Sequence, residues 1–178
     1  MNFITRYFFN KYIAENKIDR SINITSLDKA KNVGIICDIT TEDTYKEIYA
    51  VFAGLQNTRR SAWLIGYIDE KTVPFYCLQQ LTADFFCYKD LNWFGRPEKV
   101  QINDFIQTEF DLLIDFSQES YPAILALLEL SHAHFIVGGA APKAKYYDLL
   151  INTPDKLSHK ELLQNIERYT KKLSGEAL

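Results

Sequence analysis

Hydrophobic residues follow two spacings along this chain, one typical of buried strands and the other of helices. Short, nearly continuous apolar runs predict strands at residues 33–39 and 61–68. Between them, residues 42–56 place apolar side chains three and four positions apart, as an amphipathic helix does. A strand, a helix and a strand at this spacing predict a right-handed parallel crossover.

The second half of the chain repeats this alternation. Buried-strand patterns predict strands at 110–117, 132–139 and 146–152, and helical spacing predicts helices at 121–130 and 159–173, the last capped by Ser158.

Residues 69–106 give a weaker pattern. Residues 84–88 predict a strand, whereas VPFYCLQQL (73–81) fits either a short helix or a strand. The Gly and Pro of LNWFGRPEKV (91–100) indicate an exposed loop, and INDFIQ (102–107) predicts a short helical turn.

The N-terminal segment, residues 2–18, predicts a helix with an unusually broad apolar side. That side carries Phe3, Ile4, Tyr7, Phe8 and Tyr12, widened by Phe9 and Ile13. A stripe this wide needs more than one partner surface. We favour packing on the same domain or on a second copy; the alternative is contact with an anionic membrane, because Arg6 and Lys11 make the segment locally basic.

These elements together predict a three-layer, Rossmann-like α/β fold. We expect a mostly parallel sheet of about six strands with helices on both faces, preceded by the N-terminal helix. The predicted organisation is an amphipathic helix and connection over residues 1–25 and a single domain over 26–178.

Composition narrows the function classes. The chain has 178 residues and a net charge of −3, without the cluster of Lys and Arg that nucleic-acid binding requires. Cys37, Cys77 and Cys87 lie in or beside apolar segments, as buried reduced thiols do, which favours a cytoplasmic protein. We find no transmembrane segment or signal peptide in the sequence, so any membrane contact would be peripheral, at the inner face.

The predicted topology gives the place of a binding site. Ligands of doubly wound sheets bind beyond the carboxyl ends of the strands, where strand order reverses. If strands 33–39 and 110–117 are neighbours at that point, their loops share one crevice. The first loop carries Asp38, Thr40, Thr41 and Asp43, and the second Asp115 and Ser117. Two converging carboxylates can act as a base, but Asp and Thr after a strand more often cap the next helix.

Other candidate chemistry is sparse. Gly138 and Gly139 would let a ligand approach the backbone, although ending a strand is their commoner role. His132 and His134 lack a third metal ligand nearby, so we expect no metal site. The motifs GxGxxG, GxxxxGK[ST] and GxSxG do not occur, and we therefore predict no cofactor and no nucleophilic hydrolase chemistry.

The segment FDLLIDFSQESYPAILALLELSHAHFIVGG, followed by HKELLQNIERYTKKL, resembles the N-terminal, acceptor-side half of heptosyltransferase-type GT-B glycosyltransferases. The resemblance covers about residues 110–173 and implies a Rossmann-like domain. In that family an Asp after a Gly follows the first strand and is the base toward the sugar acceptor. The resemblance places Asp43 there, with Glu42 in place of the Gly.

Those transferases bind the nucleotide-sugar in a second domain of similar size, so the resemblance implies half of such an enzyme without transferase activity. The chain also resembles an uncharacterised family of short, single-domain bacterial proteins, which we take as the closer match.

We therefore predict a non-catalytic binding or interaction module. Its expected partners are a second copy, a polar small molecule, or a membrane surface contacted through Phe3, Arg6, Tyr7, Phe8 and Lys11. The alternative is an enzyme, or a subunit of one, that acts on a sugar or phosphorylated molecule with Asp43 as its base.

Overall fold

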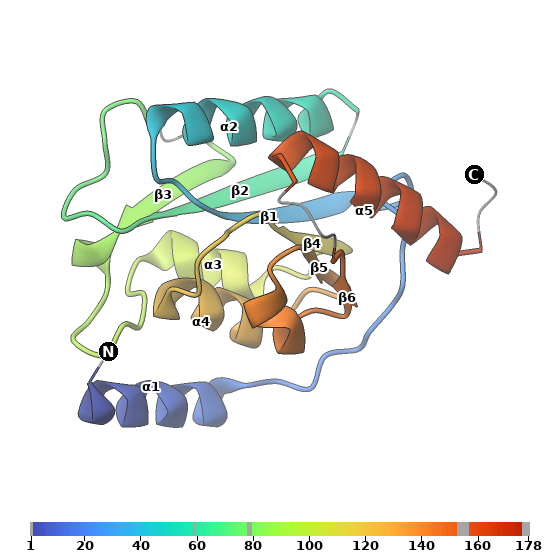
Figure 1. Cartoon of the computed structure of the whole chain (residues 1–178). Coiled ribbons are helices and arrows are strands. Elements are labelled where there is room, and N and C mark those ends of the chain that lie inside the picture. Colours follow the sequence, from blue (N-terminus) through green and yellow to red (C-terminus); the bar gives the residue numbers. More distant parts are fainter. Residues whose placement is uncertain (1, 59, 78–79, 153–156, 176–178) are drawn as a thin grey trace.

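The computed structural model describes residues 2–58, 60–77, 80–152 and 157–175, which form one six-stranded sheet flanked by helices (Figure 1). Every strand pair in these ranges is parallel. The strands are β1 (Asn32–Asp38), β2 (Ser61–Ile68), β3 (Ala83–Cys87), β4 (Leu112–Asp115), β5 (Ile136–Gly138) and β6 (Leu149–Leu150).

Strand order across the sheet is β3-β2-β1-β4-β5-β6, the order of a doubly wound fold. The reversal falls between β1 and β4, which are paired in parallel, with Val33 opposite Leu112 and Ile36 opposite Asp115. This confirms the prediction that these two strands are neighbours.

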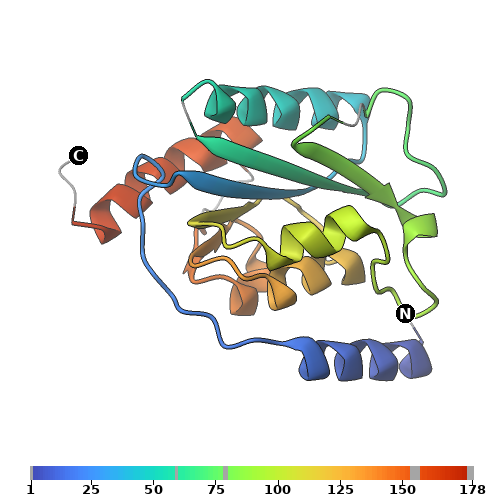
Figure 2. The same ribbon diagram turned by 180° about the vertical axis from the view of Figure 1, so that it is seen from behind.

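Helices cover both faces of the sheet, as predicted. On one face lie α2 (Glu42–Gln56) and α5 (His159–Leu173), and on the other α3 (Val100–Gln107) and α4 (Pro122–Leu130) (Figures 1 and 2). Successive residues of β1 alternate between the two cores: Ile35 packs in the α2 and α5 core, and Ile36 in the other. Because both faces are covered, the strands read as continuous apolar runs.

The helix α1 (Phe3–Asn16) lies outside α4, as an extra layer on that face (Figure 2). Its inner side buries Phe9 and places Tyr12 and Ile13 against the α3 and α4 core. Phe3 and Tyr7 point elsewhere and remain 85% and 58% exposed. The broad apolar side predicted from sequence is therefore two faces, of which one has a partner within the chain.

The connection from α1 to β1 runs extended past the α4 side of the sheet (Figure 1). Arg20 fixes it through a bidentate ion pair with Asp148, at 2.9 and 3.0 Å, and a 2.9 Å hydrogen bond to the Ala133 carbonyl. The Asn23 N–H also donates to the His134 carbonyl at 3.1 Å. These contacts attach the connection to the segments directly before β5 and β6.

The last two strands are shorter than predicted. Residues 132–134 precede β5 because the N–H groups of His132 and His134 donate to the carbonyls of Ile106 and Phe110, which lie outside the strands. Before β6, the 3-10 helix η2 (Ala141–Tyr146) occupies the start of the predicted strand 146–152. The apolar pattern correctly indicated burial at both places. It could not distinguish the residues of a strand from the buried residues that precede it.

The middle of the chain follows its predictions in part. The strand predicted at 84–88 is β3, followed by the 3-10 turn η1 (Tyr88–Asp90), and the predicted turn at 102–107 is the longer helix α3. In VPFYCLQQL, residues 75–77 form a turn and Gln80 a single bridge, so neither alternative describes this part. Residues 78 and 79 lie outside the described residues.

Membrane-spanning helices are absent from the described ranges, where every helix is too short or too polar to cross a bilayer.

Gly34 in β1 lies where strand packing leaves no room for a side chain. A Cβ there would stand 2.7 Å from Leu113 Cδ1 and 2.8 Å from Phe110 Cδ2, both in fully buried residues. We expect Gly34→Ala to lower the free energy of unfolding by about 1–2 kcal/mol, as overpacking does. Urea denaturation measures this, with Gly54→Ala as control, because its methyl group meets open space. Equal stability of the two variants would contradict the packing described.

Candidate functional site

The loops after β1 and β4 open at the same edge of the sheet, as predicted, and bring Asp38 and Asp115 to it. Both carboxylates are buried: the two residues are 3% and 1% exposed. A buried carboxylate needs hydrogen bonds or a counter-charge to offset its lost hydration. The partners of each therefore decide whether it is available for chemistry.

Asp115 is held in a buried network with Lys143, Ser117 and Tyr147. Its Oδ2 lies 2.8 Å from Lys143 Nζ and accepts a 2.6 Å hydrogen bond from the Tyr147 hydroxyl. Its Oδ1 accepts from the Ser117 N–H at 2.8 Å and from the Ser117 hydroxyl. Lys143 Nζ also donates to the Ser117 carbonyl at 2.7 Å and to its hydroxyl. Every donor of the ammonium and both carboxylate oxygens are occupied.

Sequence reasoning missed Lys143 and Tyr147, both contributed by the η2 region. Lys143 is fully buried, and nothing in the segment APKAKYY, which contains two lysines, predicts that burial. Burial first, and then the Asp115 carboxylate, raise the pKa of Tyr147, so its hydroxyl remains a proton donor. One feature of the sequence could have predicted a buried lysine. Asp115 lies in a predicted buried strand, and a buried carboxylate needs hydrogen bonds or a positively charged partner.

Asp38 fixes the loop after β4. Its carboxylate accepts from the backbone N–H groups of Gln118, at 3.0 Å, and Glu119, at 3.2 Å. Asp38 therefore ties the end of β1 to the chain leaving β4. Together with burial, which is the larger cause, Asp38 and Asp115 raise the pKa of the Cys37 thiol, which stays protonated.

The other residues predicted in the first loop begin helix α2. Thr41 is its N-cap, with a side chain that accepts from the Thr44 N–H at 3.1 Å, as the capping alternative expected. Asp43 lies exposed in the first turn, beside Glu42. Thr40 exchanges a 3.2 Å hydrogen bond with Thr44. Asp43, Asp38 and Asp115 thus lie in three different environments.

The space over Gly138 is taken by the chain itself. A Cβ on Gly138 would collide with the ring of Tyr147, and one on Gly139 would lie 3.1 Å from Leu162. The close approach permitted by this glycine pair is therefore used by side chains that complete the Asp115 network and the α5 core. His134 Nδ1 lies 3.2 Å from the Ser21 carbonyl, and His132 precedes β5. In the part of the chain described, no three His, Cys, Asp or Glu residues gather as a metal site.

An open cleft lies beside this buried network, at the carboxyl ends of β1 and β2. Two hollows, of about 190 and 360 Å³, meet there and share Tyr67, Asp69 and Tyr121. We call their union the Tyr67–Asp69–Tyr121 cleft. The smaller hollow is also lined by Asp38, Ile39, Thr40 and Glu70, and the larger by Asn2, Thr5, Tyr88, Leu91, Asn92, Trp93, Phe94, Gly95 and Pro122.

The cleft combines aromatic rings with negative charge. The rings of Tyr67 and Tyr121 lie 5.0 Å apart, and the Tyr67 hydroxyl donates to Asp69 Oδ1 at 2.9 Å. Burial raises the pKa of Tyr121, and the nearby carboxylates of Asp69, Asp38 and Glu119 raise it further. No Lys, Arg or His is among the described residues that line the cleft. The described side chains that line the cleft therefore carry a net negative charge.

A comparison with known protein families gives a match over nearly the whole chain. Residues 2–173 match a family whose description reads "Family of unknown function (DUF6913)". The chain belongs to this DUF6913 family. No curated protein and no solved structure matches it.

The outward side of α1 is the second exposed feature of this DUF6913 protein. We call the residues Phe3, Ile4, Tyr7 and Phe8 the α1 outer face. The Phe8 ring contacts Trp93 edge-on at 5.0 Å, and Trp93 is itself 62% exposed. Singly exposed apolar residues are ordinary, but adjacent aromatic ones mark a contact surface.

Removing one partner of the buried Lys143–Asp115 ion pair should destabilise the fold strongly. We expect Lys143→Met to lower the free energy of unfolding by about 3–5 kcal/mol, because Asp115 keeps a buried charge without its counter-ion. The paired variant Asp115→Asn, Lys143→Met should lose less than Lys143→Met alone, since no uncompensated charge remains. Chemical denaturation of the three proteins measures this. A single variant as stable as the wild type would show that the pair is not buried as described.

Proposed function

We propose that this chain is a non-catalytic binding module that takes a small, positively charged molecule in the Tyr67–Asp69–Tyr121 cleft. The observation that carries the proposal is the composition of the cleft: two tyrosine rings in tilted contact and several carboxylates, with no basic side chain among its described residues. Aromatic rings and carboxylates attract cations by their quadrupoles and charges. The position supports it too, because ligands of this fold bind at the carboxyl edge.

The same composition argues against a phosphorylated ligand. A phosphate group needs Lys, Arg or free backbone N–H groups, whereas Asp69, Glu70 and Asp38 would repel it. Among the polar small molecules that the sequence suggested, an amine therefore fits better than a sugar phosphate.

The positions of the carboxylates support a binding role over catalysis. A general base must be able to reach its substrate and exchange a proton with it. Both carboxylate oxygens of Asp115 accept hydrogen bonds inside the buried network, and both of Asp38 accept them from backbone N–H groups. Asp43, the candidate base, is exposed on α2 and is not among the residues lining the cleft.

Kinship with one half of the heptosyltransferase-type enzymes remains a proposal. Strand order β3-β2-β1-β4-β5-β6 is compatible with it, but many unrelated families share this order. A bacterial source and a cytoplasmic location likewise stay predictions from the sequence.

We propose a second role, in self-association, for the α1 outer face. The exposed aromatic side chains favour a contact surface, and the charges beside them favour protein over membrane. Lys11 is paired with Glu15 at 3.8 Å on the solvent side of α1, so that of the two basic residues considered for membrane contact Arg6 alone is left to attract anionic lipid. A second copy of the chain, contacting the same aromatic side chains, is the partner that fits best.

The ligand proposal predicts which molecules stabilise the fold. Spermidine or choline should raise the melting temperature, and glucose 1-phosphate at equal ionic strength should not, because a ligand stabilises the state that binds it. Asp69→Asn should reduce the shift. Asp104→Asn, an equal change of charge on the exposed side of α3, should leave it intact. Stabilisation by the phosphate alone, or equal shifts in both variants, would refute a cation site at Asp69.

The self-association proposal predicts a dimer that depends on α1. Light scattering should find wild-type dimers at micromolar concentration and monomers of the double variant Phe3→Ser, Tyr7→Ser, because both lost side chains belong to the exposed apolar face. Asn10→Ser, an exposed position on the same helix, should behave as wild type. A monomeric wild type that sediments with anionic vesicles, and loses this with the double variant, would instead support the membrane alternative.

A further inference from the structure

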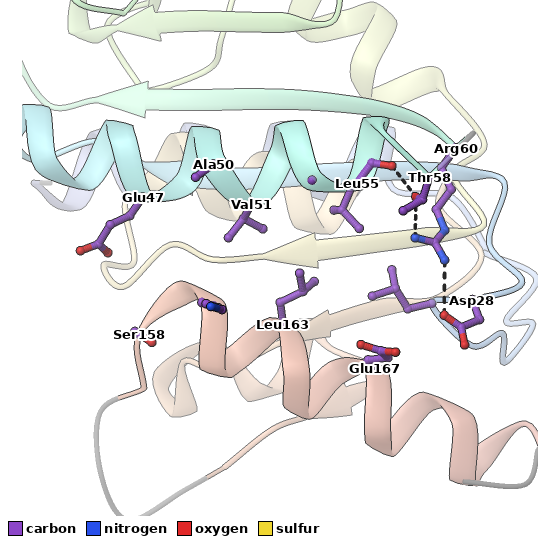
Figure 3. Close-up of a pocket in the computed structure, with 13 residues that line it drawn as sticks. Asp28, Glu47, Ala50, Val51, Leu55, Thr58, Arg60, Ser158, Leu163 and Glu167 are labelled. Carbon is purple, nitrogen blue, oxygen red and sulfur yellow. Dashed lines mark hydrogen bonds and ion pairs between the residues drawn. The ribbon is translucent and has the colours of Figure 1, made fainter.

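An elongated groove lies between α2 and α5, on the face of the sheet opposite α1 (Figure 3). Its volume is about 770 Å³. We call it the α2–α5 groove and define it by its apolar lining: Leu27, Ala50, Val51, Gly54, Leu55 and Leu163.

The depth of this groove comes from small residues on α2. Ala50 and Gly54 lie one turn apart, and a Cβ built on Gly54 would meet no atom within 4 Å. Figure 3 shows Val51 and Leu163 facing each other from the two helices. The floor is formed by Leu27 and Leu55, which are almost completely buried. The groove is therefore an open apolar channel rather than a gap closed by side chains.

The lining selects the shape of an occupant. All of its described apolar residues are aliphatic, so it offers no ring for a planar ligand to stack on. The volume lies within the usual range for small-molecule sites. From Glu47 to Leu55 the α2 wall is about 12 Å long at the helical rise of 1.5 Å per residue. A long, narrow aliphatic channel fits an unbranched hydrocarbon chain.

The charges at the rim select the head group. Asp28 and Glu167 there are already paired with Lys171, at 2.7 and 3.3 Å, and Glu47 Oε2 lies 3.0 Å from His159 Nδ1. Lys160 is exposed at the rim, and within the described ranges it has no ion-pair partner. The charge available to a ligand is therefore positive.

We propose that the α2–α5 groove binds an unbranched aliphatic carboxylate, with its chain along Leu27, Leu55 and Leu163 and its carboxylate at Lys160. This site is distinct from the Tyr67–Asp69–Tyr121 cleft and takes a ligand of opposite charge. Neither site depends on the other, so each proposal can fail alone.

Gly54 offers a test that leaves the fold intact. Gly54→Leu fills the channel, while Gly54→Ala adds one methyl group; both should raise the melting temperature, because glycine is a poor helix former. Calorimetric titration with decanoate should give wild-type affinity for Gly54→Ala. It should be weaker by about tenfold or more for Gly54→Leu, since loss of two buried methylene groups accounts for that factor.

Lys160 tests the head group separately. Wild-type protein should bind decanoate more tightly than 1-decanol. Lys160→Gln should weaken decanoate binding by about threefold, as expected for an exposed ion pair, and leave decanol binding unchanged. Equal losses for both ligands would overturn the placement of the carboxylate.

Three results would overturn the site itself: no binding of decanoate by the wild type, equal affinities of Gly54→Leu and Gly54→Ala, or loss of binding in the Phe3→Ser, Tyr7→Ser variant of the α1 outer face. Self-association that Gly54→Leu abolishes, without decanoate binding, would also reject the carboxylate in favour of a protein occupant.

Discussion

The structure at the carboxyl edge depends on neutralising one buried ammonium group. Lys143 has no contact with water, and the Asp115 carboxylate, the Ser117 carbonyl and the Ser117 hydroxyl take its three protons. Each is supplied by β4 or the residues directly after it. The pair thereby holds η2 against the end of β4, and Tyr147, which donates to the same carboxylate, fills the space above Gly138. A site that doubly wound folds often leave open to ligand is closed here by the chain.

This closure moves the accessible cleft sideways, from the β1–β4 boundary to the ends of β1 and β2. Asp38 belongs to both regions, since its carboxylate ties down the loop after β4 while the residue lines the smaller hollow. The remaining walls come from Tyr121 at the start of α4, the loop at Trp93 and the first turn of α1. The α1 helix therefore shapes the cleft in addition to presenting its outer face.

Much of the fold could be predicted because strands covered on both faces leave nearly continuous apolar runs, as Val33 to Cys37 and Leu112 to Ile114 do. The shortness of β5 and β6 could not, since Phe135 and Ile151 are buried whether or not they belong to a ladder. The place where β1 and β4 converge followed from topology, and Asp38 and Asp115 do lie there. Whether the Asp115 carboxylate is free to contact a ligand could not be predicted in the same way. It depends on Lys143 and Tyr147, which lie 28 and 32 positions after Asp115 in the sequence and come close to it only in the folded chain. The Tyr67–Asp69–Tyr121 cleft was not predicted, because two of the three residues shared by its hollows are tyrosines, which in a sequence pattern resemble residues of the hydrophobic core.

The two-residue strand β6 has a consequence for how copies of this chain can join. An edge strand promotes sheet-to-sheet pairing when it presents a long row of free backbone N–H and carbonyl groups. Leu149–Leu150 presents very few, and neither residue is fully buried. Continuous sheets running from one molecule into the next are therefore disfavoured at the β6 edge of the sheet.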